Sequence, residues 1–164
     1  MEISIMKPFL FWRDDWLLGL QNLDEQHLEL ADALNDLHLV ITHDIEEGQC
    51  RHIDQVSCQL SDLAELARRH FQGEEALMQA HDYPGLAEHH REHRLLMAEL
   101  QAYIREIEAG SRPFSLATLT ALKHWQINHV IYSDKMFADF LRCQSRSKND
   151  DKYETIARVQ TQTG

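Results

Sequence analysis

Four stretches of this chain repeat apolar residues at alternating gaps of three and four, and this repeat constrains the fold more than any other feature. Such spacing lines one side of an α-helix with apolar side chains that face a core. The short segments between the stretches each contain glycine or proline, which are common where helices end. We therefore predict an all-α fold, an up-down-up-down antiparallel four-helix bundle. The stretches span residues 23–41, 53–77, 86–107 and 119–141.

The 164 residues are enough for one core, so we predict a single domain followed by a tail. Residues 1–143 form the bundle domain, within which residues 1–22 are an N-terminal arm packed on the bundle. This arm is rich in aromatic and leucine side chains but too irregular in pattern for a regular helix. Residues 144–164 form a polar tail, in which YETIARV at 153–159 is compatible with a short helix against a partner.

The composition excludes several classes of function. The formal net charge of -11 comes from 27 acidic and 16 scattered basic residues, and it would repel nucleic-acid phosphates. No run of the chain approaches the roughly 20 apolar residues of a membrane span, and the first residues lack the features of a secretory signal. Cys50, Cys58 and Cys143 have no CxxC spacing, which argues against a disulfide framework and a thiolate zinc site. We expect a cytoplasmic protein with reduced thiols, no nucleic-acid partner and no membrane insertion.

Seven histidines and carboxylates stand at positions where the helical repeat demands apolar residues. Each would cost desolvation free energy in a core unless it is paired, hydrogen-bonded or bound to a metal. Two pairs are spaced by four residues, which puts both side chains of a pair on one helix face. Antiparallel alternation of the helices brings all seven to one level of the bundle, which predicts a shared metal site. Along the chain they are His27, His70, Glu74, His89, His93, His129 and Asp134.

The number and type of these side chains favour two metal ions. Five imidazoles and two carboxylates exceed the four ligands of a tetrahedral zinc ion. Nitrogen-rich sites with bridging carboxylates in a helix bundle suit a di-iron centre, whereas calcium and magnesium prefer oxygen ligands. His129 and Asp134 are five residues apart, about 140° on an ideal helix, so they can share a site only through a local bulge or a long reach.

Four motifs carry these residues, namely LDEQH at 23–27, HFQGEE at 70–75, YPGLAEHHREH at 83–93 and WQINHVIYSD at 125–134. In their order and internal spacing they closely resemble the hemerythrin family, specifically the single-domain bacterial hemerythrins. The resemblance covers roughly residues 12–141. A single HxxxE or HxxxH would be a weak signal, whereas the four motifs together are specific.

The resemblance implies a non-haem di-iron centre bridged by carboxylates and by an oxo or hydroxo group. The second iron would keep one open position for dioxygen or another small diatomic molecule. The family's ligand positions correspond to His89, His93 and His129 for one iron, His27 and His70 for the second iron, and Glu74 and Asp134 as bridges.

The implied function is reversible dioxygen binding, for oxygen transport, storage or sensing, by a protein that is not an enzyme. The alternative is a di-iron redox or stress protein on the same site, which would reduce peroxide or nitric oxide or store iron. Ferritin-like oxidases fit less well, because their sites are rich in carboxylates whereas this one is rich in histidine. The sequence identifies neither a protein partner nor an oligomeric state.

A candidate oxygen pocket is expected beside the open position. Its candidate lining residues are Phe71, Trp125 and Gln126, with Trp12 or Trp16 of the arm in addition. Gln126 is a departure, since the resemblance places leucine at this position. A glutamine amide there could donate a hydrogen bond to a bound ligand or admit water.

The other polar residues near the motifs are expected outside the site. Glu75, next to the bridging Glu74, is expected to point elsewhere. The remaining histidines are expected to face solvent or to support the ligands from outside, and they are His38, His43, His52, His81, His90 and His124.

Overall fold

The computed structural model describes residues 8–47, 53–111 and 114–146. Within these ranges every regular element is a helix, so the predicted all-α class is confirmed. α4 continues through a π-helix, η2, into helical residues 135–146. The elements are η1 (Asp14–Trp16), a short 3-10 helix, then α1 (Gln21–Glu47), α2 (Ile53–Ala80), α3 (Leu86–Glu108), α4 (Leu116–His129) and η2 (Val130–Asp134).

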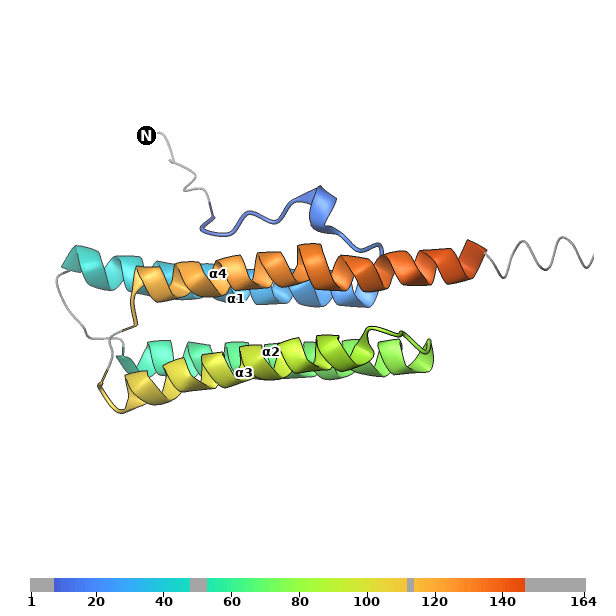
Figure 1. Cartoon of the computed structure of the whole chain (residues 1–164). Coiled ribbons are helices and arrows are strands. Elements are labelled where there is room, and N and C mark those ends of the chain that lie inside the picture. The colour runs from blue at the N-terminus through green and yellow to red at the C-terminus, as the bar shows by residue number, and fades with distance from the viewer. Residues whose placement is uncertain (1–7, 48–52, 112–113, 147–164) are drawn as a thin grey trace, which may run out of the picture.

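The four long helices form an antiparallel bundle, as predicted (Figure 1). α1 packs against α2 and α4, and α2 also packs against α3. The apolar stripes fill the centre, where Leu34, Leu37, Leu60 and Leu119 are at most 2% exposed. Burying one leucine side chain contributes roughly 1.5–3 kcal/mol. This apolar packing therefore fixes the helices in the register that brings their inward polar residues together.

Local sequence determines where the helices begin. Ser115 precedes α4, and its hydroxyl accepts a hydrogen bond from the backbone N–H of Thr118, which satisfies a free donor of the first turn. Between α2 and α3, a Cβ atom at Gly85 would lie 2.6 Å from the Tyr83 ring, so a larger residue would displace that ring. These two turns set the starts of α3 and α4.

The described residues of the N-terminal arm before α1, 8–20, lie along α4 and its continuation, so this part of the arm packs on the bundle as predicted (Figure 1). Three basic side chains donate to arm carbonyls, Lys123 to Phe9, Lys135 to Asp15 and Arg142 to Leu18.

Helix α1 attaches the arm through two further side chains. The Asn35 amide exchanges two hydrogen bonds with the backbone of Leu10, at 2.7 and 3.0 Å. The Asp24 carboxylate accepts from the backbone N–H groups of Leu18 and Gly19. The arm is thus held by specific polar contacts as well as by its aromatic side chains.

The predicted domain limits stay a prediction, since helical residues continue to 146 and the rest of the tail is outside the described residues. The expected helix at 153–159, Cys50 and His52 also lie outside them. Cys58 and Cys143 are exposed free thiols. None of the described helices has a stretch long and apolar enough to cross a lipid bilayer.

Candidate metal centre

The seven inward polar residues meet at one level of the bundle, and none is more than 8% exposed. They come from all four helices and from the end of η2. Their ligand atoms form two groups, and within each group these atoms lie within 4.8 Å of one another. The three-histidine group contains Glu74, His89, His93, His129 and Asp134, and the two-histidine group contains His27, His70 and Asp134.

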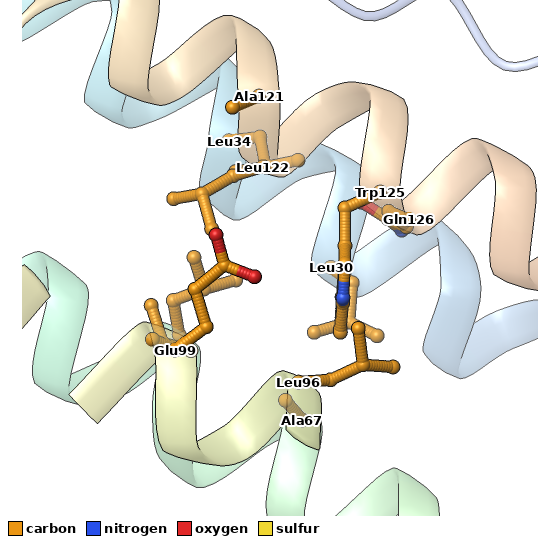
Figure 2. A pocket seen from close by; sticks show the side chains of 11 residues that line it. Leu30, Leu34, Ala67, Leu96, Glu99, Ala121, Leu122, Trp125 and Gln126 are labelled. Carbon is orange, nitrogen blue, oxygen red and sulfur yellow. The ribbon is translucent and has the colours of Figure 1, made fainter. Parts of the chain in front are cut away.

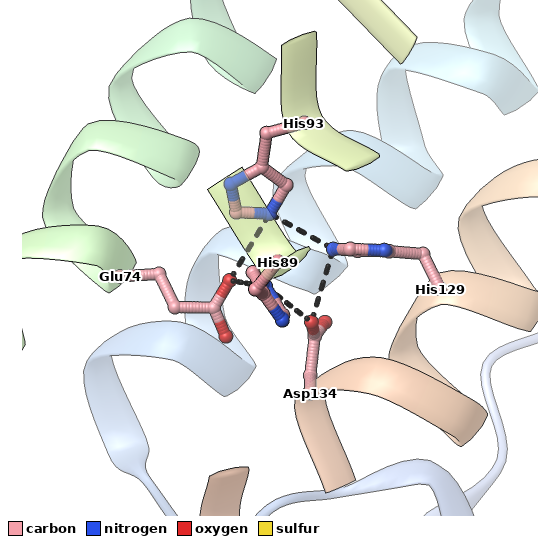
Figure 3. Close-up of side chains that lie close together, drawn as sticks. All are labelled: Glu74, His89, His93, His129 and Asp134. Carbon is pink, nitrogen blue, oxygen red and sulfur yellow. Dashed lines mark hydrogen bonds and ion pairs between the residues drawn. The ribbon is translucent and has the colours of Figure 1, made fainter. Parts of the chain in front are cut away.

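The three-histidine group has the spacing of a single coordination shell (Figure 3). The Nε2 atoms of His93 and His129 are 2.9 Å apart. Glu74 Oε2 lies 3.1 Å from His89 Nε2 and 3.4 Å from His93 Nε2. Asp134 Oδ1 lies 3.1 Å from His129 Nε2 and 3.3 Å from His89 Nε2. An ion with ligands at about 2.1 Å places ligand atoms at right angles roughly 3.0 Å apart, so these atoms could hold one ion.

The two-histidine group lies on the other side of Asp134. The Nε2 atoms of His27 and His70 are 3.1 Å apart, and Asp134 Oδ2 is 3.2 Å from His27 Nε2. Glu74 Oε2 is 4.0 Å from His70 Nε2. Asp134 therefore turns one carboxylate oxygen toward each group, which is the arrangement of a carboxylate between two ions.

The π-helix explains how Asp134 reaches the site. On an α-helix, His129 and Asp134 would point about 140° apart. In η2 the backbone N–H of Lys135 bonds to the carbonyl of Val130, five residues earlier, and this wider turn brings positions five apart onto one face. Of the two alternatives that the spacing leaves open, a local bulge and a long reach, the structure has the bulge.

Buried oxygens without hydrogen bonds indicate that the site fits a cation. Glu74 Oε1 has no hydrogen-bond partner among the described residues, and the Asp134 oxygens lie 3.1–3.3 Å from imidazole nitrogens without regular hydrogen-bond geometry, although both side chains are fully buried. Such unsatisfied groups cost free energy, and each requires an explanation in a folded protein. Coordination would compensate for this cost, and the mixture of imidazole and carboxylate ligands suits a transition metal such as iron or zinc.

The electrostatics of the metal-free cluster affect cation binding in two ways, through a charged Asp134 and through a proton held on His129. Burial and the adjacent His27 ring lower the pKa of His70 to about 4. Burial also opposes charge on His129, but Asp134 and Glu74 outweigh it and the pKa of His129 is raised. Burial alone would raise the pKa of Asp134, yet the adjacent His129 and His27 hold it well below its ordinary value. An ionised aspartate is thus available, and a metal must displace a proton that His129 retains more strongly than usual.

Three of the imidazole rings are held from outside through Nδ1. Glu75 belongs to neither group of ligand atoms, in line with the expectation that it points elsewhere than Glu74, and its Oε1 lies 2.8 Å from the outer Nδ1 of His93. Glu92 Oε2 lies 3.2 Å from His129 Nδ1, and Gln26 Oε1 lies 2.9 Å from His70 Nδ1. These functions of Gln26 and Glu92 were not predicted from the sequence. Each of the three polar residues directly adjoins a predicted ligand in the chain, which is the signal that could have found them.

Aromatic side chains pack on the imidazoles. Phe71 stacks on His93 with ring centroids 3.8 Å apart. Trp125 stacks on His129 at 6.3 Å, and Trp12 of the arm stacks on His27 at 5.7 Å. Trp16 contacts Trp12 edge to face rather than any imidazole of the cluster.

Gln126 is buried between the cluster and an apolar cavity. Its Nε2 donates a hydrogen bond to the backbone carbonyl of His27, at 3.0 Å. Figure 2 shows the cavity of about 30 Å³, whose wall includes Gln126 and Trp125. A volume of this size holds at most a few small molecules, and an apolar wall gives water few partners. The remaining lining is chiefly leucine, including Leu30, Leu34, Leu63, Leu96, Leu100 and Leu122.

The other described histidines lie outside the cluster, as expected. His43 and His124 are exposed, His81 is half-buried, and half-buried His38 stacks on Phe9. His90 lies one residue further out, since its Nδ1 is 2.8 Å from the second oxygen of Glu75, whose first oxygen contacts the ring of His93.

Comparisons with known proteins point in the same direction. A family model described as a hemerythrin HHE cation binding domain matches residues 18–141. A bacteriohemerythrin of Stenotrophomonas maltophilia (strain R551-3) is 31% identical, over 79% of this chain and 80% of that protein. A myohemerythrin of Riftia pachyptila is 25% identical, over 79% of this chain and 91% of that protein.

The fold is shared with solved structures as well. A crystal structure of wild-type hemerythrin matches with a TM-score of 0.72 and 23% sequence identity, over 80% of this chain and 96% of that chain. The family model covers most of the bundle, including all seven clustered residues. The chain belongs to the hemerythrin family.

Proposed function

We propose that this protein binds dioxygen, or another small diatomic molecule, reversibly at a di-iron centre, for oxygen transport, storage or sensing. The observation that carries this proposal is Asp134, whose two oxygens face the two histidine groups separately. When bound, the two irons supply the electrons that hold dioxygen. The proposed ligands are His89, His93 and His129 for one iron, His27 and His70 for the second iron, and Glu74 and Asp134 as bridges beside an oxo or hydroxo group.

The two groups of ligands offer unequal numbers of protein atoms. The three-histidine group supplies one more imidazole than the two-histidine group, and Glu74 lies closer to it. Since the two-histidine side is less completely surrounded by protein ligands, we place the binding position for dioxygen there.

The surrounding side chains would limit access of water. Phe71, Trp125 and Trp12 cover imidazole faces with aromatic rings. Water in the site would stabilise separated charge and favour loss of a reduced oxygen species, which would leave the metal oxidised, instead of release of dioxygen. Phe71, Trp125 and Gln126 are our proposed pocket residues.

Iron analysis and absorption spectroscopy test this function. The purified chain should bind about two irons, and the reduced protein should develop a visible absorption band in air that disappears again under nitrogen. Asp134→Asn should lower the iron content, because it removes the charge of the shared carboxylate. Asp139→Asn is the matched control, since Asp139 is exposed and pairs with Arg142. A reduced di-iron protein whose band never reverses would contradict reversible binding.

Gln126 is the observation that favours a second function, a di-iron redox or stress protein that reduces peroxide or nitric oxide or stores iron. An amide nitrogen carries two N–H donors, so beside its bond to His27 it has capacity for a hydrogen bond to a ligand. Such a bond would stabilise a reduced, more basic oxygen species. Turnover of added peroxide by the wild-type protein, abolished in Gln126→Leu, would support this alternative.

A further inference from the structure

The outward nitrogens of the clustered histidines have different partners in the two groups. In the three-histidine group, His93 Nδ1 lies 2.8 Å from Glu75 Oε1 and His129 Nδ1 lies 3.2 Å from Glu92 Oε2. Both of these partners are carboxylates. They contact the two rings whose Nε2 atoms approach each other most closely, at 2.9 Å.

The two-histidine group has no such carboxylate among the described residues. His70 Nδ1 lies 2.9 Å from the amide oxygen of Gln26, which is neutral. His27 Nδ1 is buried and has no hydrogen-bond partner within the described part of the chain. Trp12 stacks on this ring, so its neighbour on that side is aromatic.

The two carboxylates are themselves anchored. The second oxygen of Glu75 lies 2.8 Å from His90 Nδ1. Glu92 Oε2 also accepts a hydrogen bond of 2.6 Å from the Ser133 hydroxyl, and Ser133 belongs to η2. The π-turn that brings Asp134 into the site therefore also fixes the carboxylate behind His129.

A carboxylate behind an imidazole strengthens the opposite nitrogen as a ligand. It accepts a hydrogen bond from Nδ1–H, fixes the tautomer with Nε2 free to coordinate, and increases the electron density on Nε2. A neutral amide fixes the tautomer but contributes less, because hydrogen bonds to ionised acceptors are roughly twice as strong. Loss of such outer partners typically lowers metal affinity about 10- to 100-fold.

We propose that Glu75 and Glu92 are positioning residues that make the three-histidine position the tighter of two metal positions, so that it fills first and empties last. This inference rests on the proposed function only in that both groups bind a metal. The two-histidine position binds its metal ion more weakly and exchanges it more readily, because the neutral amide of Gln26 contacts His70 Nδ1 where a carboxylate would strengthen the ligand.

Cobalt(II) titration of the metal-free full-length protein, under nitrogen, tests the order of filling. Cobalt strongly shifts the proton NMR signals of the imidazoles that coordinate it, so each position has its own signals. At one equivalent we expect shifted signals only from the histidines of the three-histidine group, and those of His27 and His70 at the second equivalent. A chromophoric chelator should then remove the second ion first.

Single substitutions separate the charge of each carboxylate from its geometry. Glu75→Gln and Glu92→Gln keep an acceptor oxygen but lose the charge, and each should weaken cobalt binding at the three-histidine position about 10- to 100-fold. Binding at the two-histidine position should change less than about threefold. Gln26→Glu is the reverse experiment, and it should tighten the two-histidine position about 10-fold.

Two control variants test whether the loss of affinity is specific to the carboxylates behind the ligands. His90→Gln removes the outer neighbour of Glu75 but leaves Glu75 on His93, so it should retain most of the affinity. Glu88→Gln changes an exposed carboxylate that pairs with Arg91, and it should have no effect. Far-UV circular dichroism of every metal-free variant checks that the bundle is folded.

The outcomes distinguish this inference from the proposed function. If two cobalt ions bind with no order, or if Glu75→Gln and Glu92→Gln match the wild type, the inference is overturned while the two-metal site stands. If Glu75→Ala is impaired but Glu75→Gln is not, the side chain only orients the ring and the inference fails. If the wild-type chain binds fewer than two ions, the proposed di-metal site and the inference fail together.

Discussion

At the scale of single residues, the charge of the metal-free cluster depends on which imidazoles carry a proton. The pKa of His70 is lowered to about 4, chiefly by burial, whereas the carboxylates beside His129 raise the pKa of that ring. Folding therefore lowers the pKa of one histidine of the cluster and raises the pKa of another. The difference arises from position, since Asp134 Oδ1 lies 3.1 Å from His129 Nε2 while His70 is 4.0 Å from its nearest carboxylate, Glu74.

His70 makes the metal-free protein sensitive to mild acid. As pH falls from 6.5 toward 4, the unfolded chain takes up a proton on this ring before the folded chain does, so stability is lost in that window. A shift of this size corresponds to at most about 3 kcal/mol. The contribution of His129 is complete below 6.5 and is lost only as pH rises through its raised pKa, so it does not change within the window.

Urea unfolding of the metal-free protein from neutral pH down to pH about 4.5 measures this dependence. His70→Asn should flatten the loss of unfolding free energy over the window, even if the variant is less stable at neutral pH. The carboxylates Glu74 and Asp134, whose pKa values are lowered, act at lower pH because their stabilisation is lost only as pH falls through those values. An equally steep loss in His70→Asn would show that another group is responsible.

If the chain binds dioxygen as proposed, we expect Gln126 to influence the lifetime of the oxygenated protein. We predict that Gln126→Leu loses its oxygenated absorption band more slowly than the wild type, because leucine extends the apolar wall and offers no donor to bound ligand or water. The substitution also removes the hydrogen bond to the His27 carbonyl, at a cost of about 1 kcal/mol. The exposed Gln101→Leu serves as the control, and equal or faster decay in Gln126→Leu would refute the prediction.

At the scale of elements, α4 is the least regular helix and the one that completes the site. Its π-turn at η2 places Asp134 over His129, and its basic residues hold the arm. The arm in turn brings Trp12 onto His27. α4 and its continuation therefore position Asp134 and also hold the arm, whose Trp12 stacks on His27 of the two-histidine group.

Asn35 is predicted to fasten the arm from α1. Asn35→Ala removes two hydrogen bonds to the backbone of Leu10 and should lower the unfolding free energy by about 1–3 kcal/mol. The loosened arm should expose Trp12, so acrylamide should quench tryptophan fluorescence more strongly. Asn22→Ala, at an exposed position of the same helix, should leave both measurements unchanged.

At the scale of the whole molecule, bound metal would join all four helices, since each helix contributes at least one clustered residue. Loading with iron should therefore raise the melting temperature. At a free metal concentration about 1,000 times its Kd, one ion adds about 4 kcal/mol. For a chain of this length that corresponds to roughly 8–16 °C per ion.

Thermal unfolding with and without a chelator measures this effect. Chelation should lower the Tm of the iron-loaded wild type, and it should lower the Tm less in a double variant, His89→Gln with His129→Gln, which loses two ligands of the three-histidine group but keeps the two-histidine group. The same Tm for iron-loaded and metal-free wild type would mean that the cluster does not bind iron in the folded state.

The sequence by itself determined the all-α class, the antiparallel order of the helices and the seven residues that meet in the core. These follow from periodicity, because an apolar stripe must face a core and a polar residue on that stripe must face it too. The spacing of five between His129 and Asp134 left a local bulge and a long reach as alternatives, and only the structure decided for the bulge.

Only the tertiary structure decided how the clustered residues are supported. Glu75 and Glu92 lie beside the apolar stripes, where periodicity alone does not distinguish a solvent-facing side chain from one that turns back onto a ligand. The direction of the Gln126 amide toward the His27 carbonyl and the path of the arm along α4 were likewise undetermined. These contacts join residues far apart in the chain, and they depend on helix rotation and side-chain torsion, which a local repeat does not encode.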